Sequence, residues 1–324
     1  MSRIVFVLLA VVGVGAAAFF WFASQDLTQS EINPAVSVVR EQITESLRTK
    51  GADTAYMLFK EKYRNADFDV QHNVAHVFGK SLYEVSGVAG LRVCDDSFSF
   101  GCYHGFFTPA VASEGLDVVT ELNTACLSSA QPSACRHGIG HGILEYLGHS
   151  RLTDALLACK KTDQPDPLAG CTSGVFMEYN VPLSVREDGT FALQTRPLLN
   201  PEEPYHPCTE VSPEFRVSCY HELPQWWMQV YMADFKTMGA QCADAPGESF
   251  ISACFAGLGN IVASFAKYDP EKSAELCALM PSETWRRVCI LNAAWSFETD
   301  ARSRERAGSL CEYLPSSERQ TCLR

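Results

Sequence analysis

The 324-residue sequence lacks the features of a nucleic-acid-binding surface and of the common catalytic centres. It has no run of more than two Lys or Arg residues, and its net charge is −12, so no basic surface is available to contact phosphates. It also contains no H-E-x-x-H or G-x-S-x-G motif and no glycine-rich phosphate or dinucleotide loop. Nucleic acid is therefore excluded as a partner, and any enzymatic site must be built from other residues.

The N-terminal segment is a long apolar stretch. Residues 4–23 are apolar or small, which is enough to cross about 30 Å of hydrocarbon as one helix. The stretch ends in the bulky run 19–22, which favours an uncleaved anchor over a cleaved signal peptide. Arg3 precedes it and acidic residues follow it, so the bulk of the chain is expected on the periplasmic or extracellular side. The predicted division is a transmembrane anchor at 1–24, a linker at 25–34 and an ectodomain at 35–324.

The cysteines support the same compartment. There are 14 of them, and no C-x-x-C redox motif or zinc-ribbon spacing occurs. Their short and long gaps alternate, which is typical of local disulfides formed in an oxidising compartment. The predicted pairs join sequence neighbours: Cys94 with Cys102, Cys126 with Cys135, Cys159 with Cys171, Cys208 with Cys219, Cys242 with Cys254, Cys277 with Cys289, and Cys311 with Cys322.

The cysteine pairs also define a repeat. First cysteines recur every 32–35 residues, apart from a gap of 49 between Cys159 and Cys208. Stretches that end at a first cysteine, such as 152–159 and 270–277, carry Ala and Leu at helical spacing, and a second helix opens near the second cysteine. A Gly often follows in a Cys-x-x-Gly pattern, which lets a neighbouring helix approach closely. Each repeat is therefore a helical hairpin closed by a disulfide.

This unit resembles the disulfide-bonded, cysteine-rich helical repeat proteins of the tetratricopeptide-like class. The resemblance covers about residues 90–324 and rests on repeat length, on Ala-Cys closing one helix and on Cys-x-x-Gly opening the next. It implies an all-α fold, an α-solenoid of about eight helical-hairpin repeats whose concave face binds a protein or peptide partner. The tetratricopeptide Trp/Leu/Gly/Tyr signature is absent, so the resemblance assigns no site residue.

Two segments depart from the repeat. Residues 35–90 are expected to form a first unit without cysteines, with one or two amphipathic helices over 36–63. Residues 71–85 are expected to form the helix that corresponds to the second helix of the later hairpins. Residues 181–207 are an insertion rich in proline. Insertions in repeat proteins often lie on the binding face, so this loop is expected to cover part of the groove.

Histidines carry the most informative chemistry. Six of the eight occupy two positions of the repeat, His221 among them, and His72/His76 and His137/His141 are pairs at i, i+4, on one face of a helix. Because second helices of successive units lie side by side, the five histidines of the first three units should face one groove, with at least three ring nitrogens within about 4 Å of one another. Neutral imidazoles bind Cu, Zn or Fe. The predicted metal ligands are His72, His76, His104, His137 and His141.

Glu145 follows His141 by one helical turn, and Glu178 lies on the second helix of the following unit. Both are therefore candidate metal ligands, groups that orient a ligand, or catalytic bases. Inherited packing of histidines at a repeated position, or proton transfer without a metal, would also explain the pattern. The sequence therefore predicts a membrane-anchored extracytoplasmic repeat protein that binds a transition metal, and it leaves open whether the metal is catalytic. The alternative is a metal-free scaffold that binds a protein or peptide on its concave face.

Overall fold

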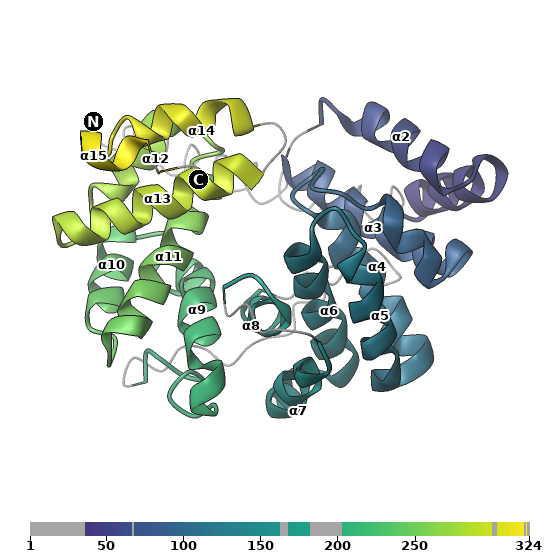
Figure 1. Cartoon of the computed structure of the whole chain (residues 1–324), viewed down its shortest axis with the longest axis horizontal. Helices are drawn as coiled ribbons and strands as arrows, with labels where there is room; N and C mark the ends of the chain where they lie inside the picture. Colours follow the sequence, from purple (N-terminus) through teal and green to yellow (C-terminus); the bar gives the residue numbers. More distant parts are fainter. Residues whose placement is uncertain are drawn as a thin grey trace, which may run out of the picture.

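The protein is all-helical in the part of the chain that its computed structural model describes (Figure 1). The described residues are 36–66, 68–162, 168–181, 203–299, 303–320 and 322, and they contain no strand. The predicted anchor at 1–24 and linker at 25–34 lie outside them, as do residues 182–202 of the insertion. The expectation that the insertion covers the groove therefore concerns residues that are not described.

The cysteine-free first unit is present as expected. A helix over residues 36–50 is followed by α2 (Ala52–Tyr63) and α3 (Phe68–Ser86), so the stretch 36–63 forms two helices. Gly51, with φ of 78°, separates the first two helices in a backbone conformation that glycine adopts without strain. Helix α3 corresponds to the second helix of the later hairpins, and it carries the first histidine pair, His72 and His76.

Except in the last unit, the later units follow the same order of a short helix and a longer one. The short helices are α5 (Val119–Leu127), α7 (Leu152–Ala158), α10 (Phe235–Ala243), α12 (Pro270–Cys277) and α14 (Arg304–Cys311). The second helices are α4 (Gly101–Glu114), α6 (Pro132–Leu147), α8 (Cys171–Asn180), α9 (Arg216–Val230), α11 (Glu248–Phe265), α13 (Glu283–Thr299) and α15 (Ser316–Arg319). Short 3₁₀ segments connect them: η1 (Val88–Val93), η2 (Gly115–Val118), η3 (His149–Arg151), η4 (Cys159–Lys161) and η5 (Pro213–Phe215).

Three units differ from the predicted hairpin. The 3₁₀ segment η1 stands in place of an α-helix before Cys94, because Gly87, with φ of 56°, ends α3 and leaves only a short segment before the cysteine. Residues 203–212 form turns rather than a helix around Cys208, where Pro204 and Pro207 lack the backbone N–H that a helix needs. In the last unit, Cys322 follows α15 instead of opening it.

Local sequence explains several helix starts. Asp269 accepts a hydrogen bond from the backbone N–H of Lys272, and Pro270 occupies the first turn of α12. Asp234 caps α10 in the same way, through the N–H groups of Lys236 and Thr237. These caps fix where the short helices begin after each turn.

The seven disulfides join the predicted sequence neighbours, and the prediction of local connectivity is confirmed. Their Cα–Cα distances are 5.4–6.0 Å, within the usual range for a disulfide. Each bridge joins cysteines that are 8–12 positions apart within one unit, and no described cysteine is free. Loops of this size contribute about 2–4 kcal/mol each by restricting the unfolded chain.

Second helices pack on one another in chain order. Helix α3 packs against α4, α4 against α6, α6 against α8, α8 against α9, α9 against α11, and α11 against α13. The Cys-x-x-Gly glycines allow this: a Cβ at Gly105 would lie 1.9 Å from the carbonyl oxygen of His76, and one at Gly257 would lie 1.8 Å from that of His221. The predicted role of these glycines is therefore confirmed. Helices α8 and α9 form a smaller interface, where Glu222 replaces the glycine.

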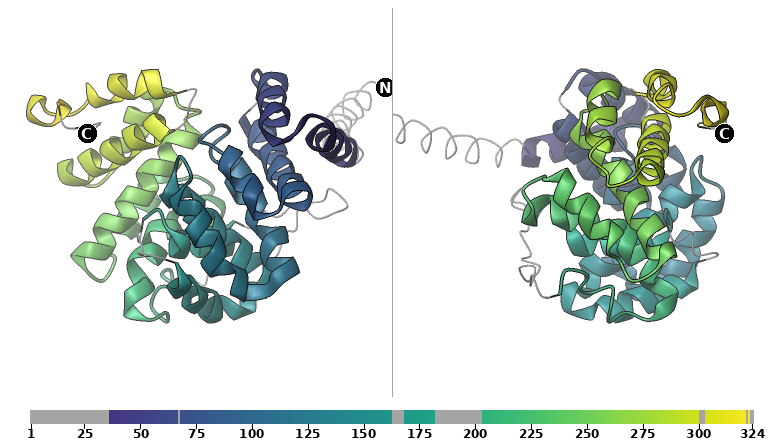
Figure 2. Two further views of the ribbon diagram at one scale, coloured as in Figure 1. Left: turned by 45° about the vertical axis from the view of Figure 1, so that its right-hand side comes forward. Right: turned by 90° about the vertical axis from the view of Figure 1, so that its left-hand side faces the viewer.

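The helices follow an arc whose two ends meet. In Figure 1 the first unit and α14 lie near each other at the top, on opposite arms of the arc, and Figure 2 shows the succession from two other sides. Arg304 at the start of α14 donates a hydrogen bond to Asp96 between η1 and α4, at 2.5 Å and across 208 positions of the chain. The arc thus places the second helices around an interior that contains the histidines.

Helix α11 is long and apolar enough to span a membrane, by length and composition, among the described residues. It packs between α9 and α13, and 56% of its apolar window is buried. Phe255 and Leu258 are fully buried there, so its apolar side chains form part of the protein core.

Candidate metal centre

The five predicted ligands lie together on three successive second helices. His72 and His76 extend from α3, His104 from α4, and His137 and His141 from α6. Within each i, i+4 pair the two Nε2 atoms are close, at 3.0 Å for His72 and His76 and 3.1 Å for His137 and His141. The helical repeat therefore brings together side chains that are up to 69 positions apart in the sequence.

The cluster consists of two triads that share one residue. The first is His72, His76 and His104, and the second is His104, His137 and His141. In each triad one ligand atom from every residue lies within 4.8 Å of the others. The two Nε2 atoms of each pair lie within the expected 4 Å, and the 4.8 Å limit for the whole triad means that a small side-chain movement is enough to close it around an ion. The pairs themselves already match an N–metal–N angle of about 95° at bonds of about 2.05 Å.

Hydrogen bonds fix the orientation of one ring in each pair. The Nδ1–H of His72 donates to the carbonyl oxygen of Phe98 at 2.9 Å, because that oxygen can only accept. The Nδ1–H of His141 donates to the Glu178 carboxylate, also at 2.9 Å. Both interactions direct a lone pair on Nε2 toward the partner histidine. A carboxylate or carbonyl that holds the far nitrogen of a ligand is the usual arrangement around metal-binding histidines.

The protonation states follow from burial. Burial lowers the pKa of His137 to about 3 and that of His141 to about 4, although the Glu222 carboxylate raises both. Burial, together with the neighbouring imidazoles, holds the pKa of His76 and His104 well below the usual range. All four rings are consequently neutral near pH 7, which is the form of histidine that binds metals.

His104 contains an unsatisfied polar atom. Its side chain is buried, with 9% of the residue exposed, and its Nδ1 has no hydrogen-bond partner in the described part of the chain. Leaving such an atom unpaired costs about 1–3 kcal/mol. The donor set therefore fits a transition metal: it consists of five imidazoles, two of which have their Nδ1–H groups bound to acceptors, and it includes one buried nitrogen that a cation would satisfy.

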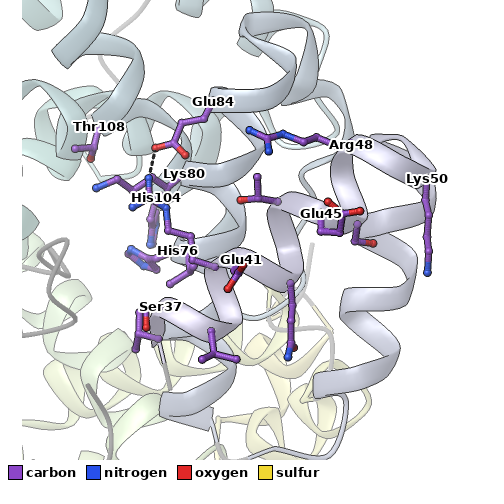
Figure 3. A pocket seen from close by; sticks show the side chains of 18 of the residues that line it. Ser37, Glu41, Glu45, Arg48, Lys50, His76, Lys80, Glu84, His104 and Thr108 are labelled. Atoms are coloured by element: carbon purple, nitrogen blue, oxygen red, sulfur yellow. Dashed lines mark hydrogen bonds and ion pairs between the residues drawn. The ribbon is translucent and has the colours of Figure 1, made fainter. Parts of the chain in front are cut away.

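A cavity of about 950 Å³ opens beside the cluster. His76 and His104 point toward it, and the helix over residues 36–50 faces them with Ser37 and Glu41 (Figure 3). His141 also lines the cavity, so each pair contributes one ring to its surface. A volume of this size is typical of small-molecule sites.

The two predicted carboxylates have different surroundings. Glu178 orients His141, whereas Glu145 accepts a hydrogen bond from the Thr108 hydroxyl and lines the cavity without a hydrogen bond to a histidine. Burial raises the pKa of Glu145 to about 6, and the nearby Glu178 adds to this effect while Thr108 and Lys80 oppose it. Glu145 is thus suited to proton transfer near neutral pH.

Two contacts of the cluster were not predicted from sequence. The Sδ atom of Met177 lies 3.4 Å from Nε2 of His137, and the backbone oxygen of Phe98 holds His72. Met177 occupies the repeat position that His141 has in the preceding unit. Its place in the repeat was therefore the one sequence feature from which its position next to the histidines could have been predicted. The Phe98 contact depends on the left-handed turn over residues 98–100, for which a local pattern gave no indication.

The remaining histidines lie outside the two triads. His221 bonds Glu222 at 2.8 Å and Asn260 at 3.3 Å, and Glu222 is held by Ser173 in a separate buried polar group. His149 contacts the backbone oxygen of Glu178, and His206 lies near Glu210. Trp226 and Trp227 are both buried and form part of the core.

Comparison of the chain with protein-family models, with curated proteins and with solved structures finds no match. The geometry of the site therefore carries the functional argument alone.

Proposed function

We propose that this protein is a membrane-anchored, extracytoplasmic α-solenoid of about eight helical hairpins that binds a transition metal through His72, His76, His104, His137 and His141. The observation that carries the proposal is the convergence of these five imidazoles, with Nδ1 of His72 and of His141 bound to acceptors. A hydrogen bond within each pair accounts for the 3.0 and 3.1 Å separations of the Nε2 atoms, but it does not account for the unsatisfied His104 ring between the two pairs.

The solenoid part of the proposal is supported by the packing order. Each second helix contacts the second helices before and after it, which is the nearest-neighbour pattern of repeat proteins. The compartment is supported by the seven disulfides, because cytosolic thiols are kept reduced. Membrane anchoring is supported by the apolar stretch at residues 4–23.

The metal is copper, zinc or iron, since imidazole suits all three. The thioether of Met177 beside His137 favours copper at the second triad, because soft sulfur ligands select Cu(I). An enzymatic activity at this centre would use Glu145 for proton transfer, given its raised pKa and its position in the same cavity as His76, His104 and His141.

One observation favours the second candidate, a metal-free scaffold that binds a protein or peptide. The 950 Å³ cavity is larger than an ion requires, and its wall carries both cationic and anionic side chains, among them Arg48, Lys80 and Glu45. Such a surface could hold a charged peptide segment. The two candidates differ in whether a metal is bound.

Metal analysis of the full-length chain separates these functions. The protein would be expressed without a polyhistidine tag in an oxidising compartment, purified in detergent, and analysed for Cu, Zn and Fe by mass spectrometry. We expect at least one transition-metal ion per chain, and a loss of at least half of it in the His137→Ala/His141→Ala variant. The His206→Ala variant is the control, because His206 lies outside both triads. A wild-type chain that stays metal-free after incubation with each metal would favour the scaffold.

A further inference from the structure

His104 lies between the two histidine pairs. Its ring centroid is 5.3 Å from those of both His72 and His76, 5.5 Å from that of His137 and 4.8 Å from that of His141. Within the described residues it is the one histidine that belongs to both triads. The α4 helix thus presents a single imidazole to two sets of ligand atoms.

One ion cannot use both pairs. Bonds of about 2.0–2.1 Å keep all ligand atoms of an ion within roughly 4.2 Å of one another, even when two ligands are opposite. In the described part of the chain, the groups with ligand atoms within 4.8 Å are the two triads, and neither contains members of both pairs. A single ion would therefore leave one pair with its two Nε2 atoms facing each other at about 3 Å.

His104 has the ring atoms to serve both sides. Its buried Nδ1 has no hydrogen-bond partner among the described residues. The α3 pair and the α6 pair approach the same ring, because Gly105 allows α4 to pack directly on the backbone of His76. An imidazole has two nitrogens on opposite sides of the ring, so it can bind one ion through each of them.

We propose that the cluster holds two transition-metal ions, one in each triad, joined by the His104 ring. One ion is bound by His72, His76 and one nitrogen of His104, and the other by His137, His141 and the second nitrogen. As the second ion binds, the His104 ring loses its remaining N–H proton to solvent and becomes an imidazolate, so that both of its nitrogens donate a lone pair. This inference rests on the proposed metal-binding function and specifies how many ions the site holds.

The two halves are chemically different. Met177 Sδ lies 3.4 Å from Nε2 of His137, beside the second triad. In the first triad, the Nδ1–H of His72 donates a hydrogen bond to the Phe98 carbonyl oxygen instead. Both halves contribute to the same cavity, through His76 on one side and His141 on the other, with His104 between them. A ligand in this cavity would therefore contact a two-ion centre.

Copper is a suitable probe, because two Cu(II) ions joined through an imidazolate are magnetically coupled. The full-length wild-type chain would be titrated with Cu(II), and its copper content compared with the integrated electron paramagnetic resonance signal. We expect two copper ions per chain and a spin count well below the copper content. The His72→Ala/His76→Ala and His137→Ala/His141→Ala variants should each bind one copper with full spin, and His206→Ala should behave like the wild type.

The outcomes are distinguishable. One copper per wild-type chain would overturn the two-ion centre and leave metal binding standing, whereas no copper would overturn both. Two coppers with full spin would show separate, unbridged sites. His104→Gln tests the bridge directly: it should abolish the coupling, and coupling that persists would contradict the assignment to His104. Circular dichroism of each variant checks that the helical fold is retained.

Discussion

Gly174 on α8 lies directly against His137 on α6: a Cβ added to Gly174 would be 1.9 Å from the carbonyl oxygen of His137. The same relationship joins Gly105 to His76 and Gly257 to His221. The glycine of one unit therefore contacts the backbone of a histidine in the preceding unit. These contacts between a glycine and a histidine carbonyl therefore determine both how closely successive helices pack and where the candidate metal ligands lie.

The Gly174→Ala variant should lower the free energy of unfolding by about 1–3 kcal/mol, because the added methyl group forces α8 away from α6. Gly308→Ala is the matched control, since a Cβ there meets no described atom within 4 Å. The control should be neutral or stabilising by up to about 1 kcal/mol, from the higher helix propensity of alanine. Denaturant titration of both variants measures the difference, and equal stabilities would contradict the close-packing argument.

The Glu178→Gln variant should weaken metal binding by about 10- to 100-fold, because a neutral amide oxygen accepts the Nδ1–H bond of His141 more weakly than the carboxylate and increases the basicity of the ring less. Glu145→Gln is the control, because Glu145 bonds Thr108 and has no hydrogen bond to a histidine. Its metal affinity should stay within a factor of a few of the wild type. Competition with a chelator of known affinity provides the measurement. A similar loss in both variants would mean that charge in the cavity, rather than orientation of His141, controls binding.

Removing the Cys277–Cys289 disulfide with a double Ala substitution should cost about 2–4 kcal/mol of stability. The metal content should not change, because this bridge joins α12 and α13, and neither helix carries a residue of the two triads. Thermal unfolding and metal analysis of the same preparation test both statements. If the variant lost metal as well as stability, the C-terminal units would affect the folding of the distant histidine-bearing units, which contradicts coupling between neighbouring units alone.

Asp95 should make stability depend on pH in the acid range. Burial raises the pKa of its carboxyl, but hydrogen bonds from Lys60, Ser97 and Tyr56 together lower it below the ordinary value of 3.8. The stabilisation is therefore complete above about pH 4 and is lost as the pH falls through the lowered folded-state pKa. The Asp95→Asn variant should be less stable than the wild type at pH 7, and the difference should narrow below pH 4. A difference that is constant from pH 7 to pH 2 would exclude this linkage.

Much of the fold could be predicted because its information is local and repeated. The disulfide neighbours, the first unit without cysteines and the shared face of the histidines all follow from spacing in the sequence. The unit around Cys208 was mispredicted because prolines there override the repeat. Met177 was not assigned to the site because a thioether contact depends on its rotamer. The contact of Arg304 with Asp96 could not be predicted either, because it depends on the curvature summed over all the units between them.

The Arg304–Asp96 contact also limits how this architecture can change over time. An open array of hairpins can gain or lose a unit by duplication or deletion, since only the neighbours of that unit are affected. Here an added or missing hairpin would shift one end of the arc relative to the other and separate the two charges. The contact between the two ends therefore depends on the number of units between them, although one partly exposed ion pair contributes only about 0–1 kcal/mol.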